Sequence, residues 1–110
     1  VVAPVARSHR PDLLIISAGF DAHADDPLAQ CRLDDDCYAQ MTATVRELGA
    51  EWEVPVLVCL EGGYDLDALA RSVLATVRAL GDSLAPAASD PEMAREERER
   101  FAPYWPEALG

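Results

Sequence analysis

The chain has 110 residues, half of them apolar, so it can bury one modest core. Its formal charge of −11 argues against nucleic-acid binding through phosphates. The 3 cysteines are odd in number and lack CxxC spacing, which indicates neither a disulfide framework nor a thiolate zinc site and favours a reduced, cytoplasmic compartment.

No apolar stretch reaches the ~18 to 20 residues of a membrane span, and no basic start precedes an apolar segment. We therefore expect a soluble protein without a membrane partner. The chain opens on Val1-Val2-Ala3-Pro4 with no methionine, so we expect it to be cut from a longer protein. It lacks Lys and is rich in Ala and Arg, which indicates a bacterial genome of high GC content.

The first ten residues are expected to end a helix, although Pro4 interrupts the pattern. The first strand is predicted at 12–17, because its apolar run LLII is too short for an ordinary helix and lacks alternation. A loop over residues 18–33 follows and contains several acids. Ordered loops of this length are usually functional in compact domains.

A helix is predicted from Asp34, its N-cap, to about Gly49. Asp35 and Asp36 place negative charge in the first turn, where the helix dipole favours it. One apolar stripe repeats at steps of three and four residues and is expected to lie on a sheet. It consists of Tyr38, Met41, Val45, Leu48 and Trp52.

A second strand is predicted at 55–60, again apolar without alternation, so both faces of the sheet are expected to be covered. The chain then turns through EGGY into a second helix, which Asp65 would cap and Gly81 would end. The expected buried stripe of this helix consists of Leu66, Leu69, Val73, Val77 and Leu80.

Strand, helix, strand and helix form a βαβ unit, so the predicted fold class is α/β with parallel strands and a right-handed crossover. Asp21 and Tyr64 each follow the carboxyl end of a strand, and ligands bind outside those ends in open α/β sheets. The topology therefore predicts the acidic loop and the glycine-tyrosine loop at one edge of the sheet.

The predicted organisation is an α/β body over residues 1–81, followed by a linker and a tail helix over residues 82–110. The linker at 83–91 is rich in Ala, Pro and Ser, and residues 92–100 are expected to form a charged, solvated helix. Phe101, Tyr104 and Trp105 are expected to anchor the tail against the body.

Gly62, Gly63 and Tyr64 form one group of residues that could carry chemistry. The two glycines let the backbone approach a ligand closely, and the tyrosine hydroxyl could hydrogen-bond to a developing oxyanion. An ordinary structural turn explains the two glycines equally well.

Asp21 and His23 form a second group, because residues two apart send their side chains to one side if the backbone is extended. A catalytic zinc usually takes three protein ligands, so this pair would need a third. Asp25 and Asp26 are the local candidates. The alternative is that His23 is a surface residue, or one that lies near the metal without binding it.

The stretch IISAGFDAHADDPLA and the later stretch VLVCLEGGYDLDALARSV resemble the C-terminal part of the histone deacetylase and acetylpolyamine amidohydrolase family, closest to its bacterial and class II-like members. The match covers roughly residues 10–81, and the two motifs in this order are more specific than either alone. The resemblance implies part of the arginase-deacetylase fold, with parallel strands and helices on both faces of the sheet.

In that family a catalytic zinc is held by an Asp and a His of one DxH segment and by an Asp of a later SAGFD-type segment. Asp21 matches this later Asp, so the resemblance implies that it binds Zn²⁺. The DxH segment itself and the tandem histidines that act as general base and acid are absent here. Tyr64 matches the catalytic tyrosine of the family's LEGGY motif, which supports the oxyanion.

Leu28 matches a position that lines the channel for acyl-lysine. Gly62 and Gly63, which let the backbone approach a ligand closely, are expected to bind the substrate as well. Asp26 matches the Asp of the family's GDP-type segment, whereas Asp25 replaces its frequent glycine and leaves the loop shape open. Like His23, Asp26 is expected to lie near the metal without binding it.

The resemblance thus predicts a fragment of a zinc-dependent hydrolase that deacetylates acyl-lysine or acetylated amines and is inactive alone. We expect it to associate with the missing N-terminal portion or with a second copy of itself. The alternative is a non-catalytic, deacetylase-like interaction module or the product of a decayed gene.

Overall fold

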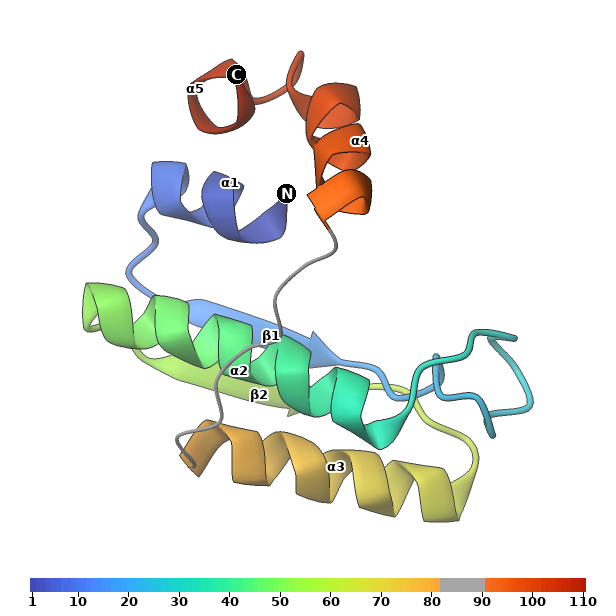
Figure 1. Ribbon diagram of the computed structural model, residues 1–110. Helices are drawn as coiled ribbons and strands as arrows, with labels where there is room; N and C mark the ends of the chain where they lie inside the picture. The colour runs from blue at the N-terminus through green and yellow to red at the C-terminus, as the bar shows by residue number, and fades with distance from the viewer. Residues whose placement is uncertain (82–90) are drawn as a thin grey trace. The chain divides into compact units, whose positions relative to one another are not determined.

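A parallel pair of strands forms the centre of the larger of two units in the computed structural model, which describes residues 1–81 and 91–110 (Figure 1). The larger unit spans Leu13–Pro86, and the smaller one combines Val1–Asp12 with Ala87–Gly110. Of the linker predicted at 83–91, residues 83–90 lie outside the described residues.

The larger unit has the element order β1 (Leu14–Ala18), α2 (Asp35–Trp52), β2 (Val56–Leu60) and α3 (Leu66–Gly81). The strands pair in parallel, with Ile16 opposite Val58, so the predicted succession of strand, helix, strand and helix is confirmed. The predicted bounds shift slightly, because β1 begins at Leu14 instead of residue 12 and α2 continues past Gly49 to Trp52.

Both helices of this unit begin at the predicted caps. The carboxylate of Asp34 accepts a hydrogen bond of 2.9 Å from the amide of Cys37. The carboxylate of Asp65 accepts one of 2.8 Å from the amide of Ala68. Each cap satisfies an amide that has no partner inside its helix, and its negative charge lies at the positive end of the helix dipole.

The core of the larger unit lies between the sheet and its two helices. Ala18, Phe20 and Tyr38 are buried there, and the rings of Phe20 and Tyr38 have centroids 4.9 Å apart. Partly buried residues complete the cluster: Ile16, Leu33, Val58, Leu69 and Val73. The cluster joins one face of the sheet to α2 and α3 together. The hydroxyl of Tyr38 is buried without a hydrogen-bond partner among the described residues.

The opposite face of the sheet carries Ile15 and Leu57, which are 61% and 50% exposed. The lack of alternation in both strands predicts helices on both faces. Within the described residues of the larger unit, α2 and α3 cover one face only. The sheet formed by the two apolar strands therefore has one face packed against α2 and α3, and one face that the larger unit leaves uncovered.

Helix α3 packs on α2 through small side chains instead of the predicted stripe of large ones. Its buried residues are Ala68, Ser72, Thr76 and Ala79. Leu66 and Val77, predicted to be buried, are exposed, as is Met41 of α2. The prediction was wrong at these three positions because helices that pack closely bury small residues, which a search for large apolar residues overlooks.

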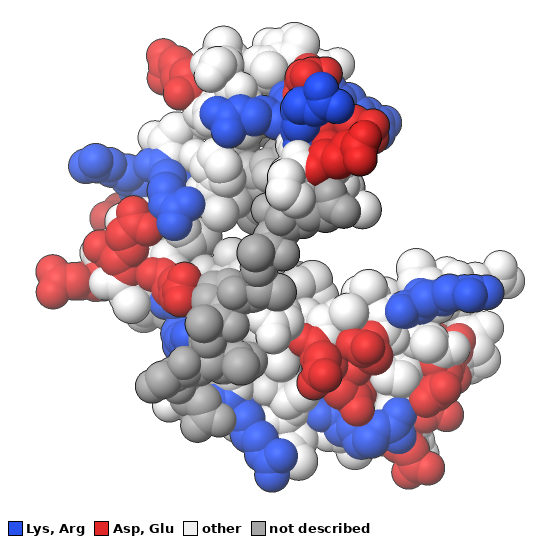
Figure 2. Space-filling view, viewed as in Figure 1, with Lys and Arg blue, Asp and Glu red and all other residues white. Residues whose placement is uncertain are grey.

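The smaller unit contains helices α1 (Val2–His9), α4 (Pro91–Phe101) and α5 (Pro106–Leu109). Pro4 lies in the first turn of α1, where its missing amide hydrogen costs little, so it does not break the helix. α4 covers the segment predicted as a charged helix. Figure 2 shows its acidic and basic side chains next to one another on the surface.

The aromatic residues of the tail contact one another instead of being buried. The centroids of Phe101 and Trp105 lie 6.5 Å apart, and those of Tyr104 and Trp105 lie 6.3 Å apart. Tyr104 is 74% exposed, and the buried residue of this segment is Leu109. The expected anchoring of the tail against the body stays a prediction. In the described parts of the chain, no helix has the length and apolar character needed to cross a membrane.

Candidate functional site

Two loops run side by side at the carboxyl ends of β1 and β2. The amide of Phe20 donates to the carbonyl of Gly62 at 2.8 Å, and the amide of Glu61 donates to the carbonyl of Ala18 at 3.1 Å. These bonds continue the parallel pairing of the strands into the loops. The segments that carry Asp21 and Tyr64 therefore lie at the same edge of the sheet.

The carboxylate of Asp21 lies against glycine backbone. A Cβ added at Gly19 would be 3.0 Å from its Oδ1, and a Cβ added at Gly62 would be 3.2 Å from the same atom. Glycine at these two positions is what lets the carboxylate lie so close to the neighbouring loop. Asp21 is half-buried, and its oxygens accept no hydrogen bond from the residues that the structure describes. They are thus available to a ligand.

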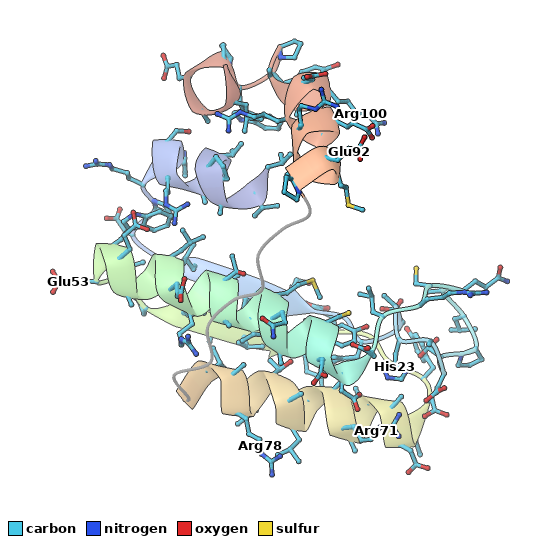
Figure 3. All side chains as sticks on the ribbon, viewed as in Figure 1. His23, Glu53, Arg71, Arg78, Glu92 and Arg100 are labelled. Carbon is cyan, nitrogen blue, oxygen red and sulfur yellow. The ribbon has the colours of Figure 1, made fainter. Side chains whose placement is uncertain are left out.

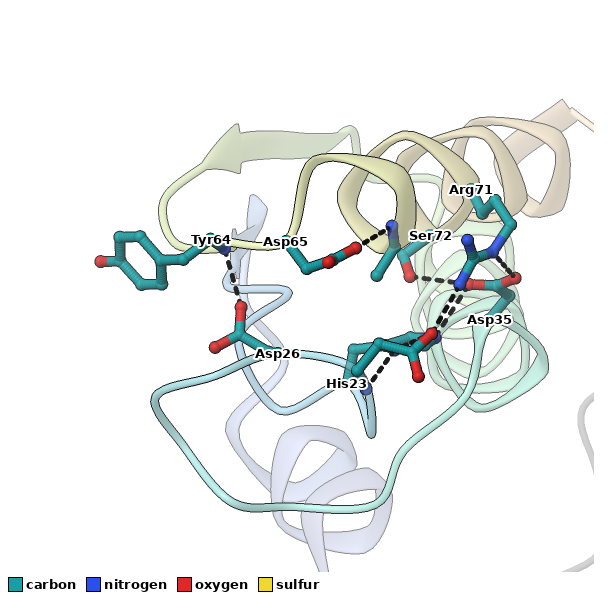
Figure 4. A network of polar contacts seen from close by, with 9 residues as sticks. His23, Asp26, Asp35, Tyr64, Asp65, Arg71 and Ser72 are labelled. Atoms are coloured by element: carbon teal, nitrogen blue, oxygen red, sulfur yellow. Dashed lines mark hydrogen bonds and ion pairs between the residues drawn. The ribbon is translucent and has the colours of Figure 1, made fainter.

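Tyr64 follows a turn that requires glycine. Gly63 has a φ of 137°, and a Cβ there would lie 2.8 Å from Cδ1 of Leu69. The side chain of Tyr64 is 59% exposed and points away from the neighbouring polar residues in Figure 4. Its hydroxyl is therefore open to a bound molecule.

Asp26 joins the two loops. Its Oδ2 accepts a hydrogen bond of 2.7 Å from the amide of Tyr64, and its Oδ1 accepts one of 2.9 Å from the amide of Leu28. Burial acts to raise the pKa of Asp26, but backbone amides, led by those of Leu28 and Tyr64, outweigh burial and lower the pKa below its usual value. Asp26 is thus a buried carboxylate at neutral pH, only 7% exposed.

His23 does not lie on an extended segment with Asp21, because residues 21 and 22 form a turn. The extended backbone on which the expected shared side of the two side chains depended is therefore not present. The Nδ1 of His23 accepts a hydrogen bond of 3.0 Å from the amide of Asp25. Because Nδ1 accepts this hydrogen bond, the ring hydrogen is assigned to Nε2, which lies 3.2 Å from Oδ1 of Asp35.

Asp35 is the centre of a polar network that sequence reasoning missed. Its Oδ1 also accepts a hydrogen bond of 3.0 Å from the hydroxyl of Ser72, and its Oδ2 accepts one of 3.1 Å from Nε of Arg71. Arg71 reaches Asp25 as well, through Nη2 at 3.0 Å. Figure 3 shows His23 and Arg71 at the same end of the unit, and Figure 4 shows the bonds. The partners lie far apart in sequence, so no local pattern identifies them.

The acids of the loop thus differ in what they contact. Asp25 is paired with Arg71 and Asp26 with backbone amides, whereas the oxygens of Asp21 remain available. Within residues 1–81 and 91–110, no group of three or more histidine, cysteine or acidic side chains is arranged to hold a metal. Asp21 fits a zinc ion as one oxygen ligand, and a three-ligand site needs two further groups.

A family model described as the histone deacetylase domain matches residues 1–80. Histone deacetylase HDA1 of Saccharomyces cerevisiae is 43% identical over 96 residues, which cover 84% of this chain and 13% of that protein. Polyamine deacetylase HDAC10 of Homo sapiens is 34% identical over 96% of this chain and 16% of that protein.

The crystal structure of the HDA15 HD domain matches 98% of this chain, with a TM-score of 0.75 and 32% sequence identity. The match covers 30% of that chain. This likeness confirms the predicted fold class, an α/β part of the arginase-deacetylase fold. The chain spans less than a third of the length of each of these three proteins.

Proposed function

Because the chain belongs to the histone deacetylase family, we propose that it forms one wall of the active site of a zinc-dependent hydrolase acting on acetylated lysine or acetylated amines. One observation supports the proposal best. An available carboxylate, Asp21, and an exposed tyrosine, Tyr64, lie on adjacent loops at the carboxyl edge of a parallel sheet. That edge is where α/β proteins bind their ligands.

Asp21 is the proposed zinc ligand of this wall, and two further ligands come from chain beyond these 110 residues. A bound zinc ion supplies Lewis-acid activation of the amide carbonyl and of the attacking water. The glycines at 19 and 62 leave room for the carboxylate, because a Cβ at either position would lie 3.0 to 3.2 Å from its Oδ1 and would have to displace it slightly.

Tyr64 is the proposed donor to the oxyanion that forms when water adds to the amide. Its ring is exposed while its backbone amide is fixed by Asp26, so the hydroxyl is presented from a rigid base. An oxyanion donor of this kind stabilises the transition state by about 3 to 4 kcal/mol. Gly63 makes the turn that brings the backbone close to the substrate.

Leu28 is the proposed wall of the substrate channel. Its side chain is 62% exposed, and its amide is held by the same carboxylate that holds Tyr64. An apolar wall suits the aliphatic chain of acyl-lysine, whereas a polyamine carries further positive charges that an acid would favour. The proposed preference is therefore for acyl-lysine over acetylated polyamine.

The test compares an acetyl-lysine peptide with an acetylated polyamine as substrates of the complete protein that contains these residues. We expect zinc-dependent deacetylation of the peptide, lost after chelation and restored by Zn²⁺. Leu28→Glu should shift the ratio of kcat/KM toward the polyamine. Failure to hydrolyse either substrate in the presence of zinc would contradict the proposal.

We propose that the 110-residue chain alone is inactive. We also propose that its uncovered sheet face binds either the N-terminal portion of the protein or a second copy of the chain. The exposed apolar residues Ile15 and Leu57 on this face support this, since a patch of this kind marks an interaction surface. The 110-residue chain should show no zinc-dependent deacetylation. Activity that Tyr64→Phe abolishes in this chain would overturn the prediction.

A non-catalytic interaction module is the second candidate, because the same apolar face also suits a partner protein. The two candidates differ in the complete protein, where a module would bind its partner without hydrolysing either substrate. Deacetylation that depends on Tyr64 excludes the module.

A further inference from the structure

We propose that His23 is a positioning residue, which holds Tyr64 in place through the carboxylate of Asp26. The consequence for catalysis rests on the proposed role of Tyr64. Both ring nitrogens of His23 contact other residues of the chain, so His23 acts on the oxyanion donor and not as a ligand of the metal.

The first link fixes the ring of His23 to the helices. His23 is only 5% exposed, and its Nε2 lies 3.2 Å from Oδ1 of Asp35 at the start of α2. Asp35 is itself held by Ser72 and Arg71, both in α3. The ring thus contacts a side chain that is held by both α2 and α3, the packed pair of helices.

The second link runs from the backbone of His23 to Tyr64. The carbonyl of His23 accepts a hydrogen bond of 3.0 Å from the amide of Asp26. The carboxylate of Asp26 in turn accepts the amide hydrogen of Tyr64 at 2.7 Å. A continuous series of polar contacts therefore leads from Asp35 through His23 and Asp26 to Tyr64: an ion-pair contact at Asp35, then two hydrogen bonds.

Residue 23 is held at three points, so it has little freedom to move. Besides its ring and its carbonyl, its amide donates to the carbonyl of Phe20 at 3.2 Å. Because Asp26 is bonded to the same residue, a displaced His23 would carry Asp26 with it. Tyr64 would then lose the partner that fixes its backbone.

Two substitutions distinguish the two contacts of the His23 ring, the one of Nε2 with Asp35 and the one of Nδ1 with the amide of Asp25. In His23→Gln, the terminal amide lies near the position of Nε2 and can still donate to Asp35. In His23→Asn, the shorter side chain can still accept from the amide of Asp25 but does not reach Asp35. If the bond to Asp35 carries the effect, Gln should preserve the position of Tyr64 and Asn should not.

Hydrogen exchange of the Tyr64 amide in the complete protein is the direct measurement. We expect exchange about tenfold faster in His23→Ala and in His23→Asn, and near the wild-type rate in His23→Gln. Amides of Thr76 and Ala79, buried between the helices, should keep their rates, because the change is local. His9→Ala, at the other histidine of the chain, is the matched control. It should change neither the exchange rate of the Tyr64 amide nor the rates of the Thr76 and Ala79 amides.

Kinetics supply a second readout. Loss of Tyr64 positioning should lower kcat for an acetyl-lysine peptide and leave KM nearly unchanged. In the double variant of His23→Ala and Asp35→Ala, Tyr64 exchange should be no faster than in His23→Ala alone, because both residues act through one bond.

Tyr64 exchange that stays at the wild-type rate in His23→Asn would overturn the proposal. Exchange that rises together with that of Thr76 would overturn it as well, because His23 would then support only the fold. Failure of the proposed function looks different. In that case Tyr64→Phe leaves deacetylation unchanged, whatever the exchange rates show.

Discussion

The amide of Tyr64 donates a hydrogen bond of 2.7 Å to Oδ2 of Asp26, which lies 38 residues earlier in the chain. This bond joins the loop after β1 to the loop after β2. The other oxygen of the same carboxylate holds the amide of Leu28. The proposed oxyanion donor and the proposed wall of the substrate channel therefore share one fixed point.

Asp26→Ala should reduce activity more than substrate binding. The change leaves two amides without their acceptor, so Tyr64 can shift away from the reacting carbonyl. We expect kcat of the complete protein to fall about a hundredfold with little change in KM. Small misplacements of catalytic groups cause losses of this size. Asp12→Ala, at an exposed acid, is the control. A wild-type kcat in Asp26→Ala would contradict the claim that Asp26 positions Tyr64 for catalysis.

Gly63→Ala should destabilise the protein by about 2 kcal/mol or more, because the residue has a φ of 137° and its new Cβ would lie 2.8 Å from Leu69. Gly81→Ala is the matched control, since a Cβ there meets nothing within 4 Å. Its free energy of unfolding should stay within about 0.5 kcal/mol of the wild-type value. Urea unfolding measures both. Equal stabilities of the two variants would contradict the turn geometry.

Tyr38→Phe should cost little stability, because it removes a buried hydroxyl that has no hydrogen-bond partner among the described residues. Burial, and then the charge of Asp21, raise the pKa of this hydroxyl above its usual value. We expect a change in unfolding free energy within about 0.5 kcal/mol, against a loss of about 3 to 5 kcal/mol for Tyr38→Ala. A large loss in Tyr38→Phe would show that the hydroxyl has a partner after all.

Asp35 should make stability depend on pH. Burial acts to raise its pKa, but hydrogen bonds from Ser72 and Arg71 and the charge of Arg71 outweigh it, so its pKa is lowered. Such a carboxyl stabilises the fold above its unfolded pKa of about 3.9 and loses this contribution as the pH falls through its folded pKa.

Asp35→Asn should therefore lower the free energy of unfolding at pH 7 and flatten its decline below about pH 4. Urea unfolding at a series of pH values measures this. Asp36→Asn, at the exposed neighbour, should keep the wild-type dependence. An unchanged slope in Asp35→Asn would mean that the network does not hold the carboxyl in its charged form.

Sequence alone predicted the elements and their order because the signals are local. The run LLII, the caps Asp34 and Asp65 and the glycines before Tyr64 each act through neighbours in the chain. The adjacency of the Asp21 loop and the Tyr64 loop also followed, since parallel strands bring their carboxyl ends to one edge. The assignments of zinc binding to Asp21 and of catalysis to Tyr64 stay predictions.

The parts that sequence did not predict depend on long-range packing. Ser72 and Arg71 bind Asp35 from another helix, and nothing in their local patterns indicates this pairing. The prediction that Leu66 and Val77 of α3 are buried was wrong, because the small residues of α3 pack against α2 instead. The chain turns at residues 21 and 22, where extended backbone was assumed, so the contact of His23 with Asp35 was not foreseen.

Zinc content and kcat, measured together in the complete protein for Asp21→Ala and Tyr64→Phe, test the central claim most directly. We expect Asp21→Ala to lose both bound zinc and deacetylation of an acetyl-lysine peptide. Tyr64→Phe should keep its zinc and lose about a hundredfold to a thousandfold in kcat, because it removes only the oxyanion donor. Full zinc content and wild-type kcat in Asp21→Ala would contradict the account.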